Sequence, residues 1–329
     1  MVYALYILLA VAVVLLSIKL SDYVDMLDKS TKISGAFIGA VLLAAVTSLP
    51  ELFTSISATL IVKENELVLG NILGSNLFNF AVLGLSLVMF IRSVHKGKFS
   101  RVHAMSLVAM LLMYCLIALD VFYDAFPKIG WFSLSSPIIF GVYVLFLLFT
   151  PKVEEPDEED GKEVKLSLKQ IIIRFVICAV LLVGSSIAIT YVSDKVANEL
   201  NLGKTFAGAL LLGVATSLPE MASTISLCHK KNYDAAFGNI CGSCVFNCNI
   251  LVVADLLSFQ QGHSDVYSLN NDSVMLLAFG ALIALLFIGM LYILYMKKEH
   301  KALKRSVVGI AGVLSIAAYA AFTALSIVM

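Results

Sequence analysis

Long apolar runs constrain this chain more than any other feature of its sequence. A helix that spans a bilayer needs about 20 mostly apolar residues. With 60% hydrophobic and 14% charged residues, against about 45–50% and about 25% in soluble domains, the composition excludes a soluble globular protein. We therefore predict an all-α polytopic membrane protein. Ten candidate spans cover residues 2–20, 34–62, 66–91, 102–119, 131–150, 168–192, 205–228, 233–258, 273–296 and 306–328.

Positive and negative charges are balanced over the whole chain, with 23 Lys and Arg, 23 Asp and Glu and a formal net charge of zero. Proteins that bind nucleic acid carry a basic surplus, so we expect no nucleic-acid partner. The six cysteines lack the short loops of a disulfide framework, and we interpret them as buried thiols. Cys241, Cys244 and Cys248 have helical spacing, but no histidine accompanies them, which disfavours a soft-metal site.

The basic residues predict the orientation in the membrane. Ten spans place both termini on one side, and cytoplasmic loops carry an excess of Lys and Arg. An extracytoplasmic N-terminus satisfies this rule, so we predict that both termini are extracytoplasmic and that the protein lies in the plasma membrane, the inner membrane if it is bacterial. In this topology the cytoplasmic loops include Lys29, Lys96, Lys165, Lys230 and Lys301, whereas the opposite side holds Lys63, Lys128, Lys195 and Lys204.

One long polar insert divides the chain into two halves. Residues 151–166 are rich in Asp and Glu and lie on the cytoplasmic side in this topology. Such a run is typical of a solvated linker, although it could also concentrate divalent cations near a cytoplasmic opening. It separates a first five-helix half, residues 1–150, from a second five-helix half, residues 167–329.

The two halves contain an internal repeat. The first copy, about residues 39–84, contains GAVLLAAVTSLPE and GNILGSNLFN, and the second copy, about residues 208–252, contains GALLLGVATSLPE and GNICGSCVFN. The motifs recur at offsets of 169 and 168 residues. With five spans per half, the second copy crosses the membrane in the opposite direction. Inverted repeats of this kind are typical of secondary transporters, whose substrate sites lie near the middle of the membrane.

Glu51 and Glu220 occupy equivalent positions in the repeat, inside otherwise apolar spans. A charge at the centre of a bilayer costs about 2.5–3.5 kcal/mol on insertion scales, and no Lys or Arg stands near either glutamate in the sequence. Protonation, a bound cation or a partner on another helix could stabilise them. Because two carboxylates that face one cavity would neutralise one divalent ion, we expect these residues to bind a cation.

A proline precedes each glutamate. Pro50 and Pro219 have no backbone N–H and clash with the carbonyl four residues earlier, so the helix must kink or break. Irregular backbone at membrane depth is tolerated where it is buried or lines a cavity. We therefore expect the second and seventh spans to be broken, with freed carbonyls near Ala44 and Gly213. An ordinary proline kink is the alternative.

Polar side chains accompany the glutamates at helical spacing. Thr47 and Thr216 lie four residues before them, on the same helix face, and Ser48 and Ser217 adjoin the breaks. Hydroxyl, amide, carboxylate and carbonyl oxygens are hard ligands, which suit Ca²⁺ or Na⁺. The next span of each copy carries a polar stripe, and for the asparagine that begins it helix packing is an equally good interpretation. The stripes consist of Asn71, Ser75 and Asn79 in the first copy and Asn239, Ser243 and Asn247 in the second.

Other residues have simpler expected roles. The glycines of the GNILG and GNICG motifs are expected to let helix backbones approach closely. Asp255 and the five histidines fall at span ends or in loops, where we expect them to be solvated.

The motifs resemble the two alpha-repeats of the cation/calcium antiporter superfamily, the sodium/calcium exchangers. The chain is similar to their compact, prokaryotic type, because it has no large cytoplasmic calcium-sensing insert. The resemblance implies ten transmembrane helices in two inverted five-helix repeats, with helices 2 and 7 broken at proline and helices 3 and 8 interrupted. Proton-coupled members carry a glutamate shortly after the GN of each repeat, and residues 72–75 contain none.

The resemblance also implies which residues hold the ions. Glu51 and Glu220 would bind Ca²⁺. Asn247 stands where potassium-dependent members carry aspartate, which disfavours potassium co-transport, and Cys244 stands where the first copy has Asn76, which leaves the packing beside Ser243 open. The other implied ligands are the carbonyls of Ala44 and Gly213 and the hydroxyls of Thr47 and Thr216 for Ca²⁺, the hydroxyls of Ser48, Ser217, Ser75 and Ser243 for Na⁺, and Asn79 and Asn247 near the centre.

We therefore predict a secondary active antiporter that exchanges Ca²⁺ for Na⁺ by alternating access, and not an enzyme. A Ca²⁺/H⁺ antiporter is the alternative, because membrane carboxylates also carry protons; a passive cation channel is a further one. An intramembrane hydrolase fits poorly, because the sequence shows no nucleophile and base arrangement. Ca²⁺ and Na⁺, or H⁺, would be transported ligands, and we expect no cofactor and no required protein partner beside the lipid bilayer.

Overall fold

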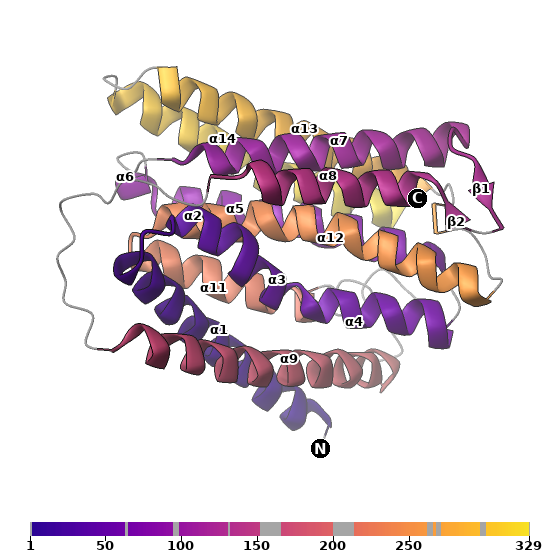
Figure 1. Ribbon diagram of the computed structural model, residues 1–329, viewed down its shortest axis with the longest axis horizontal. Coiled ribbons are helices and arrows are strands. Elements are labelled where there is room, and N and C mark those ends of the chain that lie inside the picture. Colours follow the sequence, from indigo (N-terminus) through magenta and orange to yellow (C-terminus); the bar gives the residue numbers. More distant parts are fainter. Residues whose placement is uncertain are drawn as a thin grey trace. The chain divides into compact units, whose positions relative to one another are not determined.

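The computed structural model of this chain describes residues 2–62, 65–94, 99–130, 132–151, 166–199, 214–261, 266–267, 271–296 and 301–328. Most of these residues are helical (Figure 1). The longer helices are α1 (Val2–Ser30), α5 (Asn65–Met89), α7 (Arg101–Tyr123), α8 (Ser135–Phe149), α9 (Leu168–Glu199), α11 (Leu218–His229), α12 (Tyr233–Gln261), α13 (Asn271–Met296) and α14 (Lys301–Val328).

Short helical pieces and one small hairpin connect the longer helices. The strands β1 (Lys128–Ile129) and β2 (Phe132–Ser133) pair antiparallel, and Gly130 between them has a φ of 65°, a conformation that favours glycine. This hairpin is the one departure from the expected all-α fold among the described residues. The short helical pieces are α2 (Gly35–Phe37), the π-helical turn η1 (Ile38–Leu43), α3 (Ala44–Thr47), α4 (Leu49–Ser57), the π-helical turn η2 (Ala58–Val62) and α6 (Ile91–Val94).

Among the described residues, eight helices are long and apolar enough to cross a membrane. α8 is also apolar but has 15 residues. Of the predicted span 205–228, residues 205–213 lie outside the described ones, as does most of the predicted linker, residues 152–165. The count of ten transmembrane helices therefore stays a prediction.

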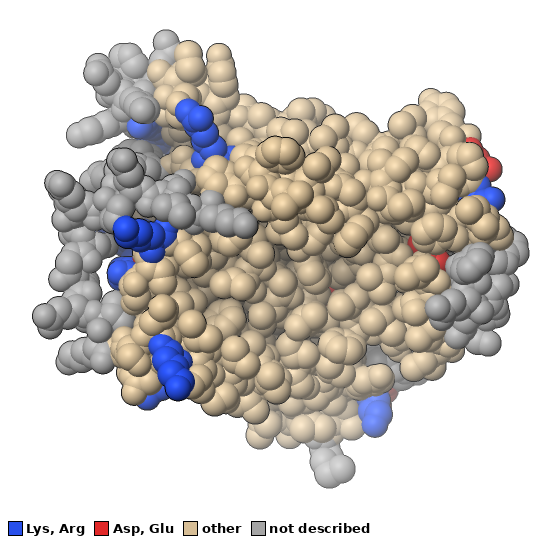
Figure 2. Space-filling model, in the orientation of Figure 1, with Lys and Arg blue, Asp and Glu red and all other residues tan. Residues whose placement is uncertain are grey.

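Apolar side chains are exposed on many of these helices. Leu8 on α1, Leu148 on α8 and Val180 on α9 are 64%, 67% and 67% exposed. The face shown in Figure 2 consists largely of residues other than Lys, Arg, Asp and Glu. Extended apolar surface is unfavourable in water and marks a membrane contact. The chain is therefore a multi-pass membrane protein.

Contacts divide the chain into two compact units, and neither is one of the sequence halves. Each unit combines segments of both halves and of both repeat copies, and α12 contributes to both units. Glu220 belongs to unit 1 and Glu51 to unit 2. Unit 1 consists of Met1–Pro50, Met89–His103 and Thr150–Ser243, and unit 2 consists of Glu51–Val88, Ala104–Phe149 and Cys244–Met329.

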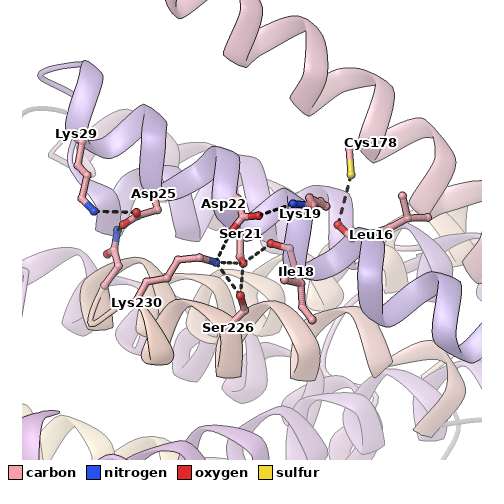
Figure 3. A network of polar contacts seen from close by, with 11 residues as sticks. Leu16, Ile18, Lys19, Ser21, Asp22, Asp25, Lys29, Cys178, Ser226 and Lys230 are labelled. Atoms are coloured by element: carbon pink, nitrogen blue, oxygen red, sulfur yellow. Dashed lines mark hydrogen bonds and ion pairs between the residues drawn. The ribbon is translucent and has the colours of Figure 1, made fainter. Parts of the chain in front are cut away.

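In unit 1, α1 packs against α9 and α11 (Figure 1). Where α1 meets the end of α11, Lys230 Nζ lies 3.0 Å from Asp22 Oδ1 and donates hydrogen bonds of 2.7 Å to the hydroxyls of Ser21 and Ser226 (Figure 3). A cation is favourable at this position because a helix ends in unpaired carbonyls. The Lys230–Asp22 pair is partly exposed, so it stabilises the unit by only about 0–1 kcal/mol.

The prediction that helices 3 and 8 are interrupted is wrong. α5 and α12 continue unbroken through the GNILGSN and GNICGSC motifs, over 25 and 29 residues. Neither motif contains a proline, and a glycine costs a helix only about 1 kcal/mol relative to alanine. A break within a membrane would leave backbone groups unpaired, which is less favourable than a continuous helix.

Two glycines of α12 allow a close helix contact in unit 1. A Cβ atom at Gly238 would lie 2.5 Å from the carbonyl oxygen of Ala36, and one at Gly242 would overlap the backbone of Ala40. The expected close approach is therefore confirmed for the second copy. For the equivalent Gly70 and Gly74, no described atom lies within 4 Å of such a Cβ, so the described residues show no close approach there.

Candidate ion-binding site

The TSLPE motif of each repeat bends the chain at its serine. Ser48 has φ −89° and ψ 3°, and Ser217 has φ −94° and ψ 7°. α4 and α11 begin at the next residue, so each proline lies in the first turn of a new helix, where a backbone N–H has no intrahelical acceptor. The predicted breaks at the two prolines are therefore confirmed, and they have the same geometry in both copies.

Each break places a glutamate in the first turn of the helix that follows. Glu51 and Glu220 are both 0% exposed. The positive end of a helix dipole stabilises a carboxylate by about 0.3–1 kcal/mol, and by up to about 2 kcal/mol in buried geometry. This is less than the roughly 2.5–3.5 kcal/mol that a charge costs at the centre of a membrane. Other polar groups must therefore contribute to stabilising each glutamate.

In unit 1 the first repeat contributes such a group to the glutamate of the second repeat. The hydroxyl of Ser48 donates a hydrogen bond of 3.2 Å to Oε1 of Glu220. Both side chains are 0% exposed. Hydrogen bonds to charged groups contribute about 1.5–3 kcal/mol. This contact joins the two copies of the TSLPE motif, which are far apart in the sequence.

Asn239 is held by neighbouring helices of unit 1. Its amide nitrogen donates hydrogen bonds of 3.0 Å to Ser223 and Thr224 on α11, and its oxygen accepts a bond of 3.4 Å from the hydroxyl of Thr47. Both ends of the amide are thus occupied. These contacts favour the packing interpretation for Asn239 over a role as an ion ligand.

The carbonyl of Ala44 is not freed by the helix break. It accepts the backbone N–H of Ser48 over 3.0 Å and lies 3.4 Å from the hydroxyl of Thr47. The expectation of a freed carbonyl at Ala44 is therefore wrong, because the chain bends after this hydrogen bond has formed. The carbonyl of Gly213 lies outside the described residues and stays a prediction.

In unit 2 a chain of side-chain amides connects α12, α5 and α7. Asn247 Nδ2 donates a hydrogen bond of 2.9 Å to Asn76 Oδ1, and Asn76 Nδ2 donates to the hydroxyl of Tyr114 over 3.1 Å and to the carbonyl of Cys244 over 3.2 Å. Sequence reasoning did not assign a role to Asn76, because Asn76 lies off the helix face that carries Asn71, Ser75 and Asn79. The difference between the two copies at this position, where the second copy has Cys244, is the sequence feature that could have identified it.

Four predicted ligands keep buried oxygen atoms that make no hydrogen bond to any described residue. All four residues are at most 4% exposed. A buried polar atom without a partner costs about 1–3 kcal/mol, so four of them are strongly unfavourable unless a ligand uses them. They form two repeat-equivalent pairs, the hydroxyls of Ser75 and Ser243 and the amide oxygens of Asn79 and Asn247.

The remaining described ligands of the predicted set, Thr47, Thr216 and Ser217, are also 0% exposed. All of the described side chains in the predicted set are therefore buried. Within unit 1 the structure brings Ser48 to Glu220. Glu51 belongs to the other unit.

The cysteines form no soft-metal site in the part of the chain that is described. Cys241, Cys244 and Cys248 are buried thiols outside any disulfide, as predicted. Cys115 is exposed, contrary to the prediction, because it lies on the outer face of α7. The described residues contain no group of three or more His, Cys, Asp and Glu side chains that could hold a metal.

Asp255 is buried and not solvated, contrary to the prediction. In unit 2 it is 0% exposed and accepts hydrogen bonds from the backbone N–H of Ser133 over 3.0 Å and from the hydroxyl of Ser136 over 2.6 Å. Asp120 accepts hydrogen bonds of 2.5 and 2.7 Å from the hydroxyls of Ser133 and Ser135. The two carboxylates lie at the N-terminus of α8, where the helix dipole favours them. They connect α7, α8 and α12 structurally.

His103 is also buried, with a side chain that is 0% exposed. Its Nε2 lies 2.6 Å from Asp234 Oδ1. The same carboxylate oxygen accepts the backbone N–H of Ser100 over 2.9 Å. Tertiary packing, which a span boundary does not reveal, has therefore enclosed this histidine in unit 1.

These observations define a multi-pass membrane protein with duplicated helix breaks and buried side chains that carry hard oxygen atoms, a combination typical of ion transporters. The family described as "Sodium/calcium exchanger protein" matches residues 1–150 and 170–328. The chain therefore belongs to the sodium/calcium exchanger family. This family consists of exchangers, which transport ions and are not enzymes.

Individual relatives agree with the family assignment. The inner membrane protein YrbG of Escherichia coli is 29% identical over 77% of this chain and 78% of its own length. The putative antiporter CaxA of Alkalimonas amylolytica is 26% identical over 76% of this chain and 78% of its own length. The vacuolar calcium ion transporter of Schizosaccharomyces pombe is 27% identical over 65% of this chain and 56% of its own length.

A solved structure shares the fold. The sodium-calcium exchanger NCX_Mj, soaked with 10 mM Na⁺ and zero Ca²⁺, superimposes with a TM-score of 0.71 over 97% of both chains at 21% sequence identity. At this identity the likeness shows the fold alone. It supports an all-helical membrane architecture for this chain.

Proposed function

We propose that this protein is a secondary active antiporter that exchanges Ca²⁺ for Na⁺ by alternating access. The observation that carries the proposal is that four of the predicted ligands, Ser75, Ser243, Asn79 and Asn247, keep buried oxygen atoms that make no hydrogen bond to the described residues. They are hard ligands in repeat-equivalent positions, and hard cations such as Ca²⁺ and Na⁺ prefer them.

The proposed ligands come from both repeats. Glu51 and Glu220 bind Ca²⁺. Their burial in the first turn of a helix supports this role, because the dipole alone does not balance the cost of a charge at membrane depth. The further Ca²⁺ ligands are Thr47, Thr216 and the carbonyl of Gly213, and the Na⁺ ligands are Ser48, Ser217, Ser75 and Ser243, with Asn79 and Asn247 near the centre.

Charge balance explains the coupling in this proposal. One Ca²⁺ or two Na⁺ neutralise the two glutamates, so a load of either kind removes the cost of carrying two carboxylates through the membrane. Without a bound cation both glutamates stay charged, and the change between the outward-open and inward-open states is then unfavourable. Competition between the two loads then produces exchange.

The proposal includes the location and the surroundings of the protein. It lies in the plasma membrane, the inner membrane if the cell is bacterial, with both termini extracytoplasmic and the acidic linker cytoplasmic. The distribution of Lys and Arg in the sequence supports this orientation. The bound ligands are the transported ions themselves. In this proposal exchange requires no cofactor and no protein partner.

Uptake of ⁴⁵Ca²⁺ into proteoliposomes tests the function. Vesicles loaded with Na⁺ are compared with vesicles loaded with choline and with choline vesicles that carry a pH gradient. We expect uptake only when Na⁺ flows outward. Uptake driven by the pH gradient alone would make H⁺ the coupling ion, and uptake without any stimulation by an opposing gradient would indicate a channel.

A further inference from the structure

The amide of Asn247 has a defined orientation in unit 2. Its nitrogen donates a hydrogen bond of 2.9 Å to Asn76 Oδ1. Its oxygen is buried and makes no hydrogen bond to the described residues. An amide oxygen binds cations, whereas an amide nitrogen carries two hydrogens and repels them. The orientation therefore decides whether Asn247 can serve as a ligand.

A backbone carbonyl determines this orientation. The carbonyl of Cys244 can only accept a hydrogen bond, so the side of Asn76 that faces it over 3.2 Å must be the amide nitrogen. Asn76 Nδ2 has a second hydrogen, which it donates to the hydroxyl of Tyr114 over 3.1 Å. The Asn76 oxygen then lies on the opposite side and accepts from Asn247. The Cys244 carbonyl thus determines the amide orientation of Asn76, and Asn76 determines that of Asn247.

Comparison of the two repeats supports a specific role for Asn76. Its equivalent in the second copy is Cys244, and the equivalent of Asn247 in the first copy is Asn79. A thiol is only a weak hydrogen-bond donor and does not replace the amide. Neither the nitrogen nor the oxygen of Asn79 makes a hydrogen bond to the described residues. The amide of Asn247, whose partner is Asn76, therefore has a defined orientation, whereas the equivalent amide of Asn79 has none.

We infer that Asn76, supported by Tyr114, is a positioning residue that keeps the oxygen of Asn247 available to a hard cation, Ca²⁺ or Na⁺. This inference rests on the proposed function only in taking Asn247 as an ion ligand. Asn79 keeps both amide orientations and serves as the adaptable member of the pair. The two repeats are thus functionally unequal at these positions.

Cation binding to purified protein tests this inference separately from transport. Titration calorimetry with CaCl₂ and with NaCl gives the half-saturating concentration of each ion for the wild type and for Asn76→Ala. We expect Asn76→Ala to raise at least one of these concentrations roughly 10- to 100-fold, the usual effect of removing a partner that orients a metal ligand. Tyr114→Phe removes one hydroxyl and should raise the same value about 2- to 10-fold.

A second background distinguishes positioning from a general structural role. In Asn247→Asp both side-chain oxygens accept, so no orientation is needed. In that background we expect Asn76→Ala to change the half-saturating concentrations by no more than about twofold, the tolerance for independent sites. Ser258→Ala is the matched control, because Ser258 is a buried polar residue on the same helix whose hydroxyl donates to its own helix at Ala254 over 2.8 Å.

The outcomes are distinct. An unchanged half-saturating concentration in Asn76→Ala and Tyr114→Phe would overturn the inference. It would also be overturned if Asn76→Ala had the same effect in both backgrounds, or if Ser258→Ala had the same effect as Asn76→Ala. If Asn76→Ala does not fold, Tyr114→Phe in the two backgrounds decides the question. A wild type that binds Ca²⁺ and Na⁺ but shows no Na⁺-driven Ca²⁺ uptake would refute the proposed function and leave the positioning role intact.

Discussion

The hydroxyl of Ser48 donates a hydrogen bond to Oε1 of Glu220 over 3.2 Å. Ser48 is the residue at which the first repeat breaks its helix, and Glu220 lies in the first turn after the break of the second repeat. A residue that shapes the backbone of one copy thus also stabilises the charge of the other.

Removal of this hydroxyl tests its energetic contribution. Ser48→Ala should raise the Ca²⁺ concentration for half-maximal uptake roughly 10- to 100-fold, because hydrogen bonds to charged groups contribute about 1.5–3 kcal/mol. The measurement is ⁴⁵Ca²⁺ uptake against Ca²⁺ concentration. Ser86→Ala is the control, because Ser86 is equally buried but donates to Val82 in its own helix. Equal behaviour of the two variants would contradict the prediction.

Neutralisation of either glutamate should remove exchange. Glu51→Gln and Glu220→Gln keep the shape of the side chain but remove a charge that would face the bound cation, and breaking a buried charge pair costs about 3–5 kcal/mol. We expect Na⁺-driven ⁴⁵Ca²⁺ uptake to fall roughly 100-fold or more, while size-exclusion chromatography shows a monodisperse protein. Near-normal uptake in either variant would disprove the assignment of that glutamate.

The equivalent glycines of the two copies should respond differently to alanine. At Gly242 a methyl group would overlap the backbone of Ala40, whereas at Gly74 no described atom lies within 4 Å. Overpacking a tight contact costs about 1–3 kcal/mol, so Gly242→Ala should lower the thermal unfolding midpoint in detergent. Gly74→Ala should change it much less. A larger loss at Gly74 would contradict the observed asymmetry.

The carboxylate of Asp255 should stabilise unit 2 without taking part in transport. Asp255→Asn keeps the volume but weakens charge-assisted bonds from Ser133 and Ser136, each worth about 1.5–3 kcal/mol. We expect a lower unfolding midpoint and unchanged half-saturating concentrations of Ca²⁺ and Na⁺ in the folded protein. A selective loss of cation affinity at full stability would show that Asp255 has a role in the ion path.

Ionisation of the buried Tyr267 hydroxyl should lower the stability of the protein at alkaline pH. Its hydroxyl lies 2.9 Å from the Ser136 hydroxyl, and burial, together with the nearby Asp255 carboxylate, raises its pKa well above the ordinary value of 10.0. Folding therefore favours the protonated phenol. The stability that this preference contributes is complete below pH 10, and it falls by about 1.4 kcal/mol per pH unit as the pH rises above 10.

Thermal unfolding between pH 8 and pH 11 checks this pH dependence. Tyr267→Phe cannot ionise at this position and serves as the comparison. Above pH 10 the wild type should lose stability faster than Tyr267→Phe. Parallel curves for the two proteins would show that the environment of Tyr267 does not favour its protonated form.

Much of the fold could be predicted from local sequence properties. Apolar run length predicted the membrane helices, and proline predicted the breaks because the missing N–H is a property of the residue itself. The expected interruptions in α5 and α12 were wrong because glycine and asparagine only weaken a helix, and burial in a membrane favours the continuous one. The short hairpin before α8 was missed because two-residue strands have no period to detect.

For the candidate site, the sequence proposed the members but did not predict their contacts. Repeat equivalence identified Glu51, Glu220 and the two serine and asparagine pairs without any structure. The same reasoning placed Asp255 in water and expected a freed carbonyl at Ala44, and both expectations failed. Exposure and hydrogen bonding depend on what packs against a residue, which a span boundary does not show.

The sequence by itself determined that this chain is a duplicated membrane protein with a carboxylate after each proline, because hydropathy, repetition and the chemistry of proline are local properties. Only the tertiary structure decided that Ser48 meets Glu220 and that Asn76 orients Asn247. The two residues of each pair are separated by more than half of the chain. They come together because each unit contains helices of both repeats, the first pair in unit 1 and the second in unit 2. Hydrogen bonds are short and directional, so such packing determines which oxygen atoms are left to bind an ion.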